Sequence, residues 1–140
     1  MAQTTPSQGK SSLAKWVAVL VVIVVVVGGL AYYLLVSSPA PAKVTVVMPN
    51  GVGANMNLNF QPVTITVVIG VNNTVVWISQ DTIAHTVLNA SAPRVFGSGT
   101  ALINSGQSFS FTFTTPGTYN YFCNLHPTWM KGTVIVKAHG

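Results

Sequence analysis

The feature that most constrains this chain is an uncharged apolar run from Trp16 to Val36, with the sequence WVAVLVVIVVVVGGLAYYLLV. At a helical rise of about 1.5 Å per residue, its 21 residues are enough to cross a hydrocarbon layer of about 30 Å. Valine is a poor helix former in water, but unpaired backbone groups are so costly in lipid that a lone segment there must be helical. The sequence therefore predicts one transmembrane helix over residues 16–36.

The residues on either side of this run indicate its orientation in the membrane and whether it is retained or cleaved. Lys10 and Lys15 precede it, which predicts a cytoplasmic N-terminus and a single-pass protein of the cell membrane whose remainder lies outside. The competing interpretation is a cleaved signal peptide, since residues 40–42 (APA) resemble a processing site. The run exceeds the roughly 7 to 15 apolar residues of such signals, which favours a retained anchor. We expect a short disordered tail over 1–15, the anchor over 16–36, a Pro/Ser spacer over 37–42 and one folded domain over 43–140.

The composition narrows the function of that domain. Charged residues make up 5% of the chain, against roughly 25% in an average soluble protein, and Asp81 is the only acidic side chain. The net charge of +5 comes from six scattered basic residues, so it reflects missing acids rather than a basic patch. Without such a patch, no nucleic-acid partner is expected.

After the spacer the chain has the pattern of an all-β protein. Phe109, Phe111 and Phe113 alternate with hydroxyl residues, as in a strand packed on one side. Short segments rich in β-branched and aromatic residues recur at regular intervals with turn residues between them, which predicts a β-sandwich. The expected strands are 44–48, 63–69, 74–79, 83–88, 108–114, 118–123 and 132–137.

The segment from Tyr119 to Met130 contains the candidate metal ligands. Cys123, the only cysteine, is followed by His126 and then Met130. The strand period of two places Cys123 on the same inward face as the tyrosines at 119 and 121. The same period aligns His85 with Ile83 and Val87, so His85 is the natural second imidazole. Two histidines, one cysteine and a methionine are the donors that copper uses for electron transfer.

These motifs resemble the cupredoxins, the small blue copper proteins, and are close to the plastocyanin and amicyanin group. The resemblance rests on residues 81–87 (DTIAHTV), 116–123 (PGTYNYFC) and 126–134 (HPTWMKGTV) and covers about 43–137. It implies a Greek-key β-sandwich and a type 1 copper site with His85, Cys123 and His126 in the plane and Met130 on the axis. Two features differ from the family pattern: three residues separate His126 from Met130, and Thr86 follows His85 where many relatives have Asn.

The donor set also limits the metal and the reaction. Zinc accepts two histidines and a cysteine, but a thioether is a poor fourth ligand for zinc and a suitable weak one for copper. A single cysteine excludes a two-copper purple centre, and an enzyme such as a nitrite reductase needs a second metal site that this chain lacks.

We therefore expect a one-electron carrier with one copper ion, Cu(I)/Cu(II), and not an enzyme. It would pass electrons between respiratory-chain components on the outer face of the membrane. Redox partners, such as a terminal oxidase, would dock at the His126 loop. The alternative is a copper storage, delivery or sensor protein without an electron-transfer role.

Overall fold

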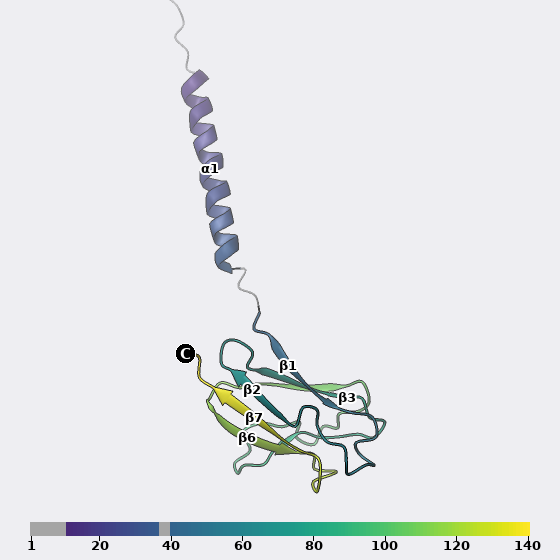
Figure 1. The fold of residues 1–140 in the computed structure, drawn as a ribbon. Coiled ribbons are helices and arrows are strands. Elements are labelled where there is room, and N and C mark those ends of the chain that lie inside the picture. Colours follow the sequence, from purple (N-terminus) through teal and green to yellow (C-terminus); the bar gives the residue numbers. More distant parts are fainter. Residues whose placement is uncertain (1–10, 37–39) are drawn as a thin grey trace, which may run out of the picture. The chain divides into compact units, whose positions relative to one another are not determined.

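The N-terminal part of the protein is one long helix. The computed structural model describes residues 11–36 and 40–140, and helix α1 spans Ser11–Val36 (Figure 1). Within it, Ala14–Val36 contains an 18-residue window with a mean hydropathy of 2.9 and is long and apolar enough to cross a membrane, as an anchor or as a signal sequence. The helix starts at Ser11, so residues 11–15 are helical and not the disordered tail that we predicted. The rest of the predicted tail, and residues 37–39 of the predicted spacer, lie outside the described residues.

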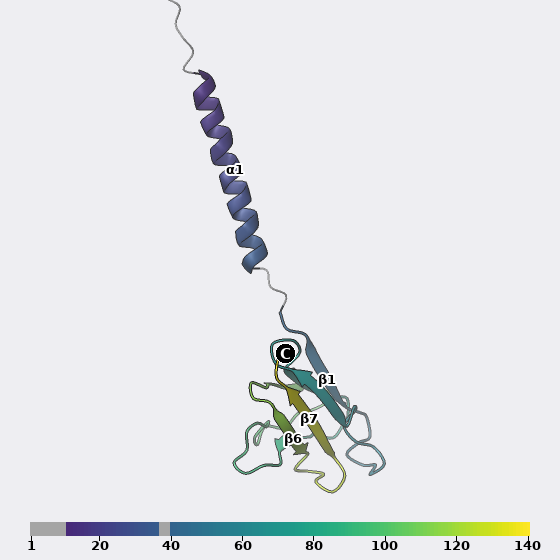
Figure 2. The ribbon, with the colours of Figure 1, turned by 60° about the vertical axis from the view of Figure 1, so that its left-hand side comes forward.

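The compact unit Pro41–Gly140 is a sandwich of two β-sheets, as predicted. Figures 1 and 2 show β2, β7 and β6 side by side in one layer. The three-stranded sheet has the order β1 (Lys43–Met48), β3 (Thr74–Ser79), β5 (Ser108–Thr112). The four-stranded sheet has the order β2 (Thr64–Val68), β7 (Lys131–Lys137), β6 (Gly117–Phe122), β4 (Leu88–Asn89).

The strand directions bring three loops to one end of the sandwich. β1 and β3 are parallel, so the segments after Met48 and Ser79 leave the sheet at the same end. β6 runs antiparallel to β7, and its last residue, Phe122, pairs with the first residue of β7, Lys131. The Cys123 side chain that follows β6 contacts residues of the segment after β3. The loops after β1, β3 and β6 therefore meet at this end.

The core is dominated by aromatic rings from both sheets. Trp77 in β3 is fully buried, stacks on Phe96 with ring centroids 5.7 Å apart, and meets the edge of Tyr121 in β6 at 5.4 Å. Phe60 also packs against the Tyr121 ring, with ring centroids 4.9 Å apart. Because Tyr121 is buried against these rings, the inward face of β6 is fixed, and Cys123 lies on that face two residues later.

The segment predicted as a strand over 83–88 differs from the prediction. Only Leu88–Asn89 form a strand there, and His85 makes a single isolated bridge, exchanging backbone hydrogen bonds of 3.1 and 2.8 Å with Ile103. Ile83 is 40% exposed and does not face inward, whereas His85 and Val87 are fully buried as predicted. Since every residue from 85 to 89 is buried, the alternation of a half-buried strand cannot apply.

Gly132 in β7 is required by the packing of Tyr121. A Cβ atom at this position would overlap the Tyr121 ring and hydroxyl. We expect Gly132→Ala to lower the free energy of unfolding by about 1–3 kcal/mol, the usual cost of overpacking a core. The measurement is urea denaturation of residues 41–140. Thr118→Ala, at an exposed position of the neighbouring strand, is the control and should change stability by less than about 0.5 kcal/mol. Equal stability of the two variants would contradict this account of the packing.

Candidate metal centre

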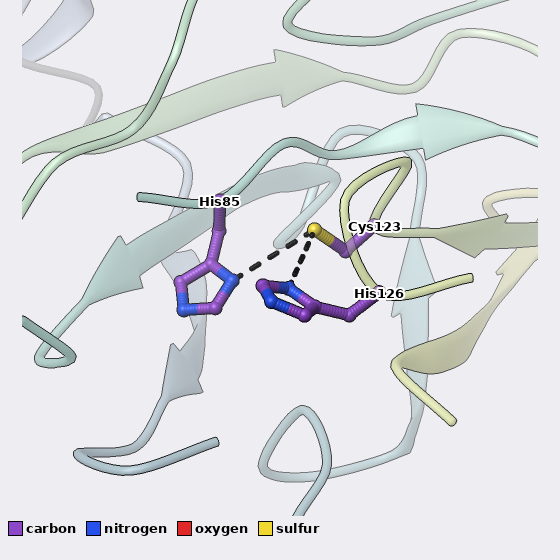
Figure 3. A group of neighbouring side chains, drawn as sticks. All are labelled: His85, Cys123 and His126. Atoms are coloured by element: carbon purple, nitrogen blue, oxygen red, sulfur yellow. Dashed lines mark hydrogen bonds between the residues drawn. The ribbon is translucent and has the colours of Figure 1, made fainter. Parts of the chain in front are cut away.

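The centre of the candidate site is the thiol of Cys123, a free and fully buried cysteine directly after β6. Its Sγ lies 3.8 Å from Nδ1 of His85 and 3.6 Å from Nδ1 of His126. Figure 3 shows both rings turned toward this sulfur, one from the segment after β3 and one from the loop after β6. One donor atom from each of the three residues lies within 4.8 Å of the others, so the structure brings together the predicted cysteine and both predicted histidines.

These separations are suitable for a single metal ion. Bonds of about 2.3 Å to sulfur and about 2.0 Å to nitrogen, 120° apart in a plane, would place sulfur and nitrogen about 3.7 Å apart. The observed separations of 3.8 and 3.6 Å bracket that value. The side chains therefore already stand where a trigonal metal site needs them, and a thiolate with two imidazoles is a donor set that copper prefers.

The loop from Cys123 to Met130 is closed by its own backbone. The Cys123 amide donates to the Met130 carbonyl at 3.0 Å, the His126 amide to the Cys123 carbonyl at 3.1 Å, and the Met130 amide to the His126 carbonyl at 3.1 Å. The last of these bonds closes an α-turn, which brings residues four apart to the same side. The three-residue spacing that distinguished this chain from its relatives thus corresponds to one helical turn. The Met130 side chain is fully buried.

The orientation of His85 is set by Asp81. The His85 Nε2–H donates to Oδ2 of Asp81 at 2.9 Å, which leaves the Nδ1 lone pair directed toward Cys123. Burial tends to raise the pKa of Asp81, but hydrogen bonds from the Gly53 and Gly51 amides and from His85 outweigh it, so this pKa lies well below its usual range. The sequence analysis missed this role. The available signal was the only acidic residue of the chain, four positions before the histidine.

Thr86 connects the segment after β3 to the cysteine loop. Its backbone amide donates to Cys123 Sγ at 3.4 Å, and its hydroxyl donates to the same sulfur at 3.8 Å. The hydroxyl oxygen also accepts a hydrogen bond of 2.9 Å from the Asn124 amide. Burial opposes ionisation of the thiol, but the hydrogen bonds with His85, the Thr86 amide and His126 outweigh it and lower the pKa of Cys123 to about 6. The environment therefore favours the thiolate, which is the form that binds metals.

The loop after β1 covers the two imidazoles. A Cβ atom on Gly53 would lie 3.2 Å from Cε1 of His85 and 3.2 Å from Cε1 of His126, so a side chain here would crowd both rings and glycine eases the close approach of the backbone. Trp129 also holds this loop. Its indole N–H donates to the Val52 carbonyl at 2.9 Å, and its ring centroid lies 5.1 Å from that of His126. Sequence reasoning did not include this loop.

The candidate ligands differ in their access to solvent. His85, Cys123 and Met130 are fully buried, whereas His126 is partly exposed. Around it, Leu125 is 48% exposed, and the side chains at 127 and 128 are also exposed. His126 is therefore the side chain through which the site meets its surroundings.

The fold and the site together define a cupredoxin, a two-sheet sandwich with one cysteine and two histidines converging at one end. Residues 46–137 match the family described as copper binding proteins, plastocyanin/azurin family. The chain belongs to this family.

Individual relatives agree with this assignment. Amicyanin-alpha of Methylorubrum extorquens is 36% identical over 70 residues, which cover 49% of this chain and 58% of that protein, so the chain spans little more than half the length of this relative. Plastocyanin of Scenedesmus fuscus is 31% identical over 102 residues, 67% of this chain and 99% of the relative.

Among solved structures, a purple cupredoxin from Nitrosopumilus maritimus is similar with a TM-score of 0.58 and 26% identity, over 67% of this chain and 99% of that one. Amicyanin of Paracoccus versutus is similar with a TM-score of 0.54 and 27% identity, over 72% and 86%.

The family and the donor set together identify the metal. His85, Cys123 and His126 converge on one point, and in a chain of this family such a cluster is a type 1 copper site. Amicyanin and plastocyanin are electron carriers without enzymatic activity, which agrees with the expectation that this chain is not an enzyme.

Proposed function

We propose that the protein is a membrane-tethered one-electron carrier with a mononuclear type 1 copper site. Copper bound there would take up and release a single electron. The observation that carries this proposal is the convergence of one thiolate and two imidazoles at separations of 3.6 and 3.8 Å, set by the protein's own hydrogen bonds. Ligands held in this way need little rearrangement when the charge of the metal changes.

In this proposal each ligand has a separate role. Cys123 Sγ and Nδ1 of His85 and His126 would hold the copper ion, and the Met130 thioether would serve as a further, weaker axial donor. The sulfur–nitrogen distances support the planar set. The complete burial of Met130 and its place one turn after His126 support the axial role.

The alternative, copper storage or delivery, requires a metal that exchanges readily. Three features argue against easy exchange here: the cysteine and one histidine are fully buried, the loop after β1 covers both rings, and Thr86 ties the segment after β3 to the cysteine loop. A rigid, enclosed site favours electron transfer over release of the ion.

In this proposal the copper domain lies outside the membrane, α1 is retained as its anchor, and the N-terminus is in the cytoplasm. Electrons would pass through His126, the partly exposed ligand, to a redox protein docked on the apolar rim formed by Leu125, Pro127 and Trp129. Electron carriers use small transient contacts of this kind. A respiratory complex such as a terminal oxidase is the partner that we propose.

Addition of cupric ion to residues 41–140 tests the copper site. We expect one ion per chain and an intense visible absorption band from thiolate-to-copper charge transfer. Cys123→Ser should abolish the band, because the hydroxyl cannot replace the thiolate. An unchanged spectrum in this variant would contradict the proposed site.

Met130→Leu tests the axial ligand. Leucine fills a similar volume but donates no electron pair. The cuprous state should therefore be stabilised relative to the cupric state, and the reduction potential should rise. The visible band should remain, and cyclic voltammetry of the purified variant measures the change. If copper binding is lost or the potential is unchanged, Met130 does not have the proposed role.

Leu125→Lys tests the docking surface through electron self-exchange between oxidised and reduced copies, measured by NMR line broadening. A positive charge on both copies at the contact should slow the exchange by about tenfold, or about 1.4 kcal/mol in activation free energy. Val71→Lys is a matched control, since Val71 is also 48% exposed but lies in the connection between β2 and β3, at the other end of the sandwich. Equal rates in the two variants would mean that electrons do not pass at the His126 rim.

A further inference from the structure

The only acidic side chain of the protein lies beside its metal site. Asp81 is 1% exposed, and its single ionic contact among residues 11–36 and 40–140 is with the His85 ring. A buried carboxylate is costly unless donors compensate it, and a surface position would carry no such cost. Its location next to a copper ligand therefore requires a physical reason.

Three N–H groups from two segments compensate this carboxylate. Oδ1 accepts the Gly51 amide at 3.0 Å, and Oδ2 accepts the Gly53 amide at 2.8 Å and the His85 Nε2–H at 2.9 Å. Asp81 is thus a bridge: one side orients a ligand ring, and the other holds the loop after β1.

The bridged loop lies directly over the metal site. A Cβ atom placed on Gly53 would lie 3.2 Å from the Cε1 atoms of His85 and His126 and 3.2 Å from Asp81 Oδ2. The Trp129 indole holds the neighbouring residue, Val52, through its carbonyl. Without the carboxylate, the Gly51 and Gly53 amides would lose their acceptor, and this part of the loop would lose its polar link to the segment after β3.

The charge of Asp81 would also affect the relative stability of the two oxidation states of the copper ion. The doubly positive cupric ion would be balanced by the Cys123 thiolate and the Asp81 carboxylate together, whereas the cuprous ion would leave a net negative charge in a buried site. Buried net charge is unfavourable, so this arrangement favours the oxidised state. The hydrogen bond from His85 acts in the same direction, because it makes the imidazole a stronger donor.

We propose that Asp81 is the positioning residue of the copper centre, which orients His85, holds the Gly51–Gly53 segment over both imidazoles and lowers the reduction potential. This inference rests on the proposed function for its effect on the potential, but its structural part concerns the metal-free protein as well.

Asp81→Asn in the full-length chain in detergent is the principal test. Asparagine keeps the size of the side chain and removes its charge. We expect copper affinity, measured by competition with a chromophoric chelator, to fall by about 10- to 100-fold. The reduction potential should rise, and the Gly51 and Gly53 amides of the metal-free variant should exchange with solvent faster than in the native protein.

Two further variants separate charge from general stability. Asn73 is also buried and also bridges two segments, accepting the Gly70 amide and donating to the Phe113 carbonyl, but it lies at the opposite end of β3. Asn73→Ala should lower the melting temperature without moving the potential. Asp81→Glu keeps the charge and should restore a potential closer to that of the native protein than Asp81→Asn does.

The outcomes are distinct. If Asp81→Asn melts at a lower temperature but keeps the native potential and copper affinity, Asp81 is merely structural and the proposal is overturned. The native metal-free protein gives a readout that does not depend on a folded variant: rapid exchange of the Gly51 and Gly53 amides would also overturn it. Failure of the proposed function would appear separately, as native protein that binds copper without the charge-transfer band while these amides remain protected.

Discussion

The hydrogen bond from the Cys123 amide to the Met130 carbonyl, at 3.0 Å, is the contact on which the site depends. It continues the ladder between β6 and β7 by one step beyond the pair of Phe122 and Lys131. The loop that carries three of the four proposed ligands is therefore closed by a hairpin in the centre of a sheet. Tyr121, packed against Trp77 and Phe60, fixes that hairpin against the core. The position of the sulfur follows from the packing of the whole sandwich.

The fourth ligand comes from a segment that is not a regular strand. His85 forms one bridge with Ile103, and its neighbours are engaged in the site: Thr86 binds the cysteine loop, and Asp81 binds the loop after β1. The buried histidine is thus oriented by the single acidic side chain of the protein, while the partly exposed histidine faces the surroundings. The two imidazoles therefore differ in their surroundings, one enclosed by the protein and one partly open to solvent, and the separate roles proposed for them rest on this difference.

Most of the sandwich could be predicted because its strands follow local rules. The boundaries of β3 agree with the prediction, and five other strands differ from it by one or two residues at an end. The strand period of two correctly predicted that the side chains of Cys123 and His85 point into the core. It failed at Ile83, which is exposed because it lies in the bend that precedes His85 and not in a strand. The start of α1 at Ser11 was missed because the prediction considered only the apolar run.

The sequence by itself determined the donor set, the spacing of Cys123, His126 and Met130, and the all-β character of the domain, because ligand chemistry and strand periodicity are properties of near neighbours. Only the tertiary structure showed the contacts of Asp81 with Gly53 and of Trp129 with Val52. These contacts join residues 28 and 77 positions apart, and no local pattern specifies such pairs. They arise because parallel β1 and β3, together with β6, release their loops at one end of the sandwich.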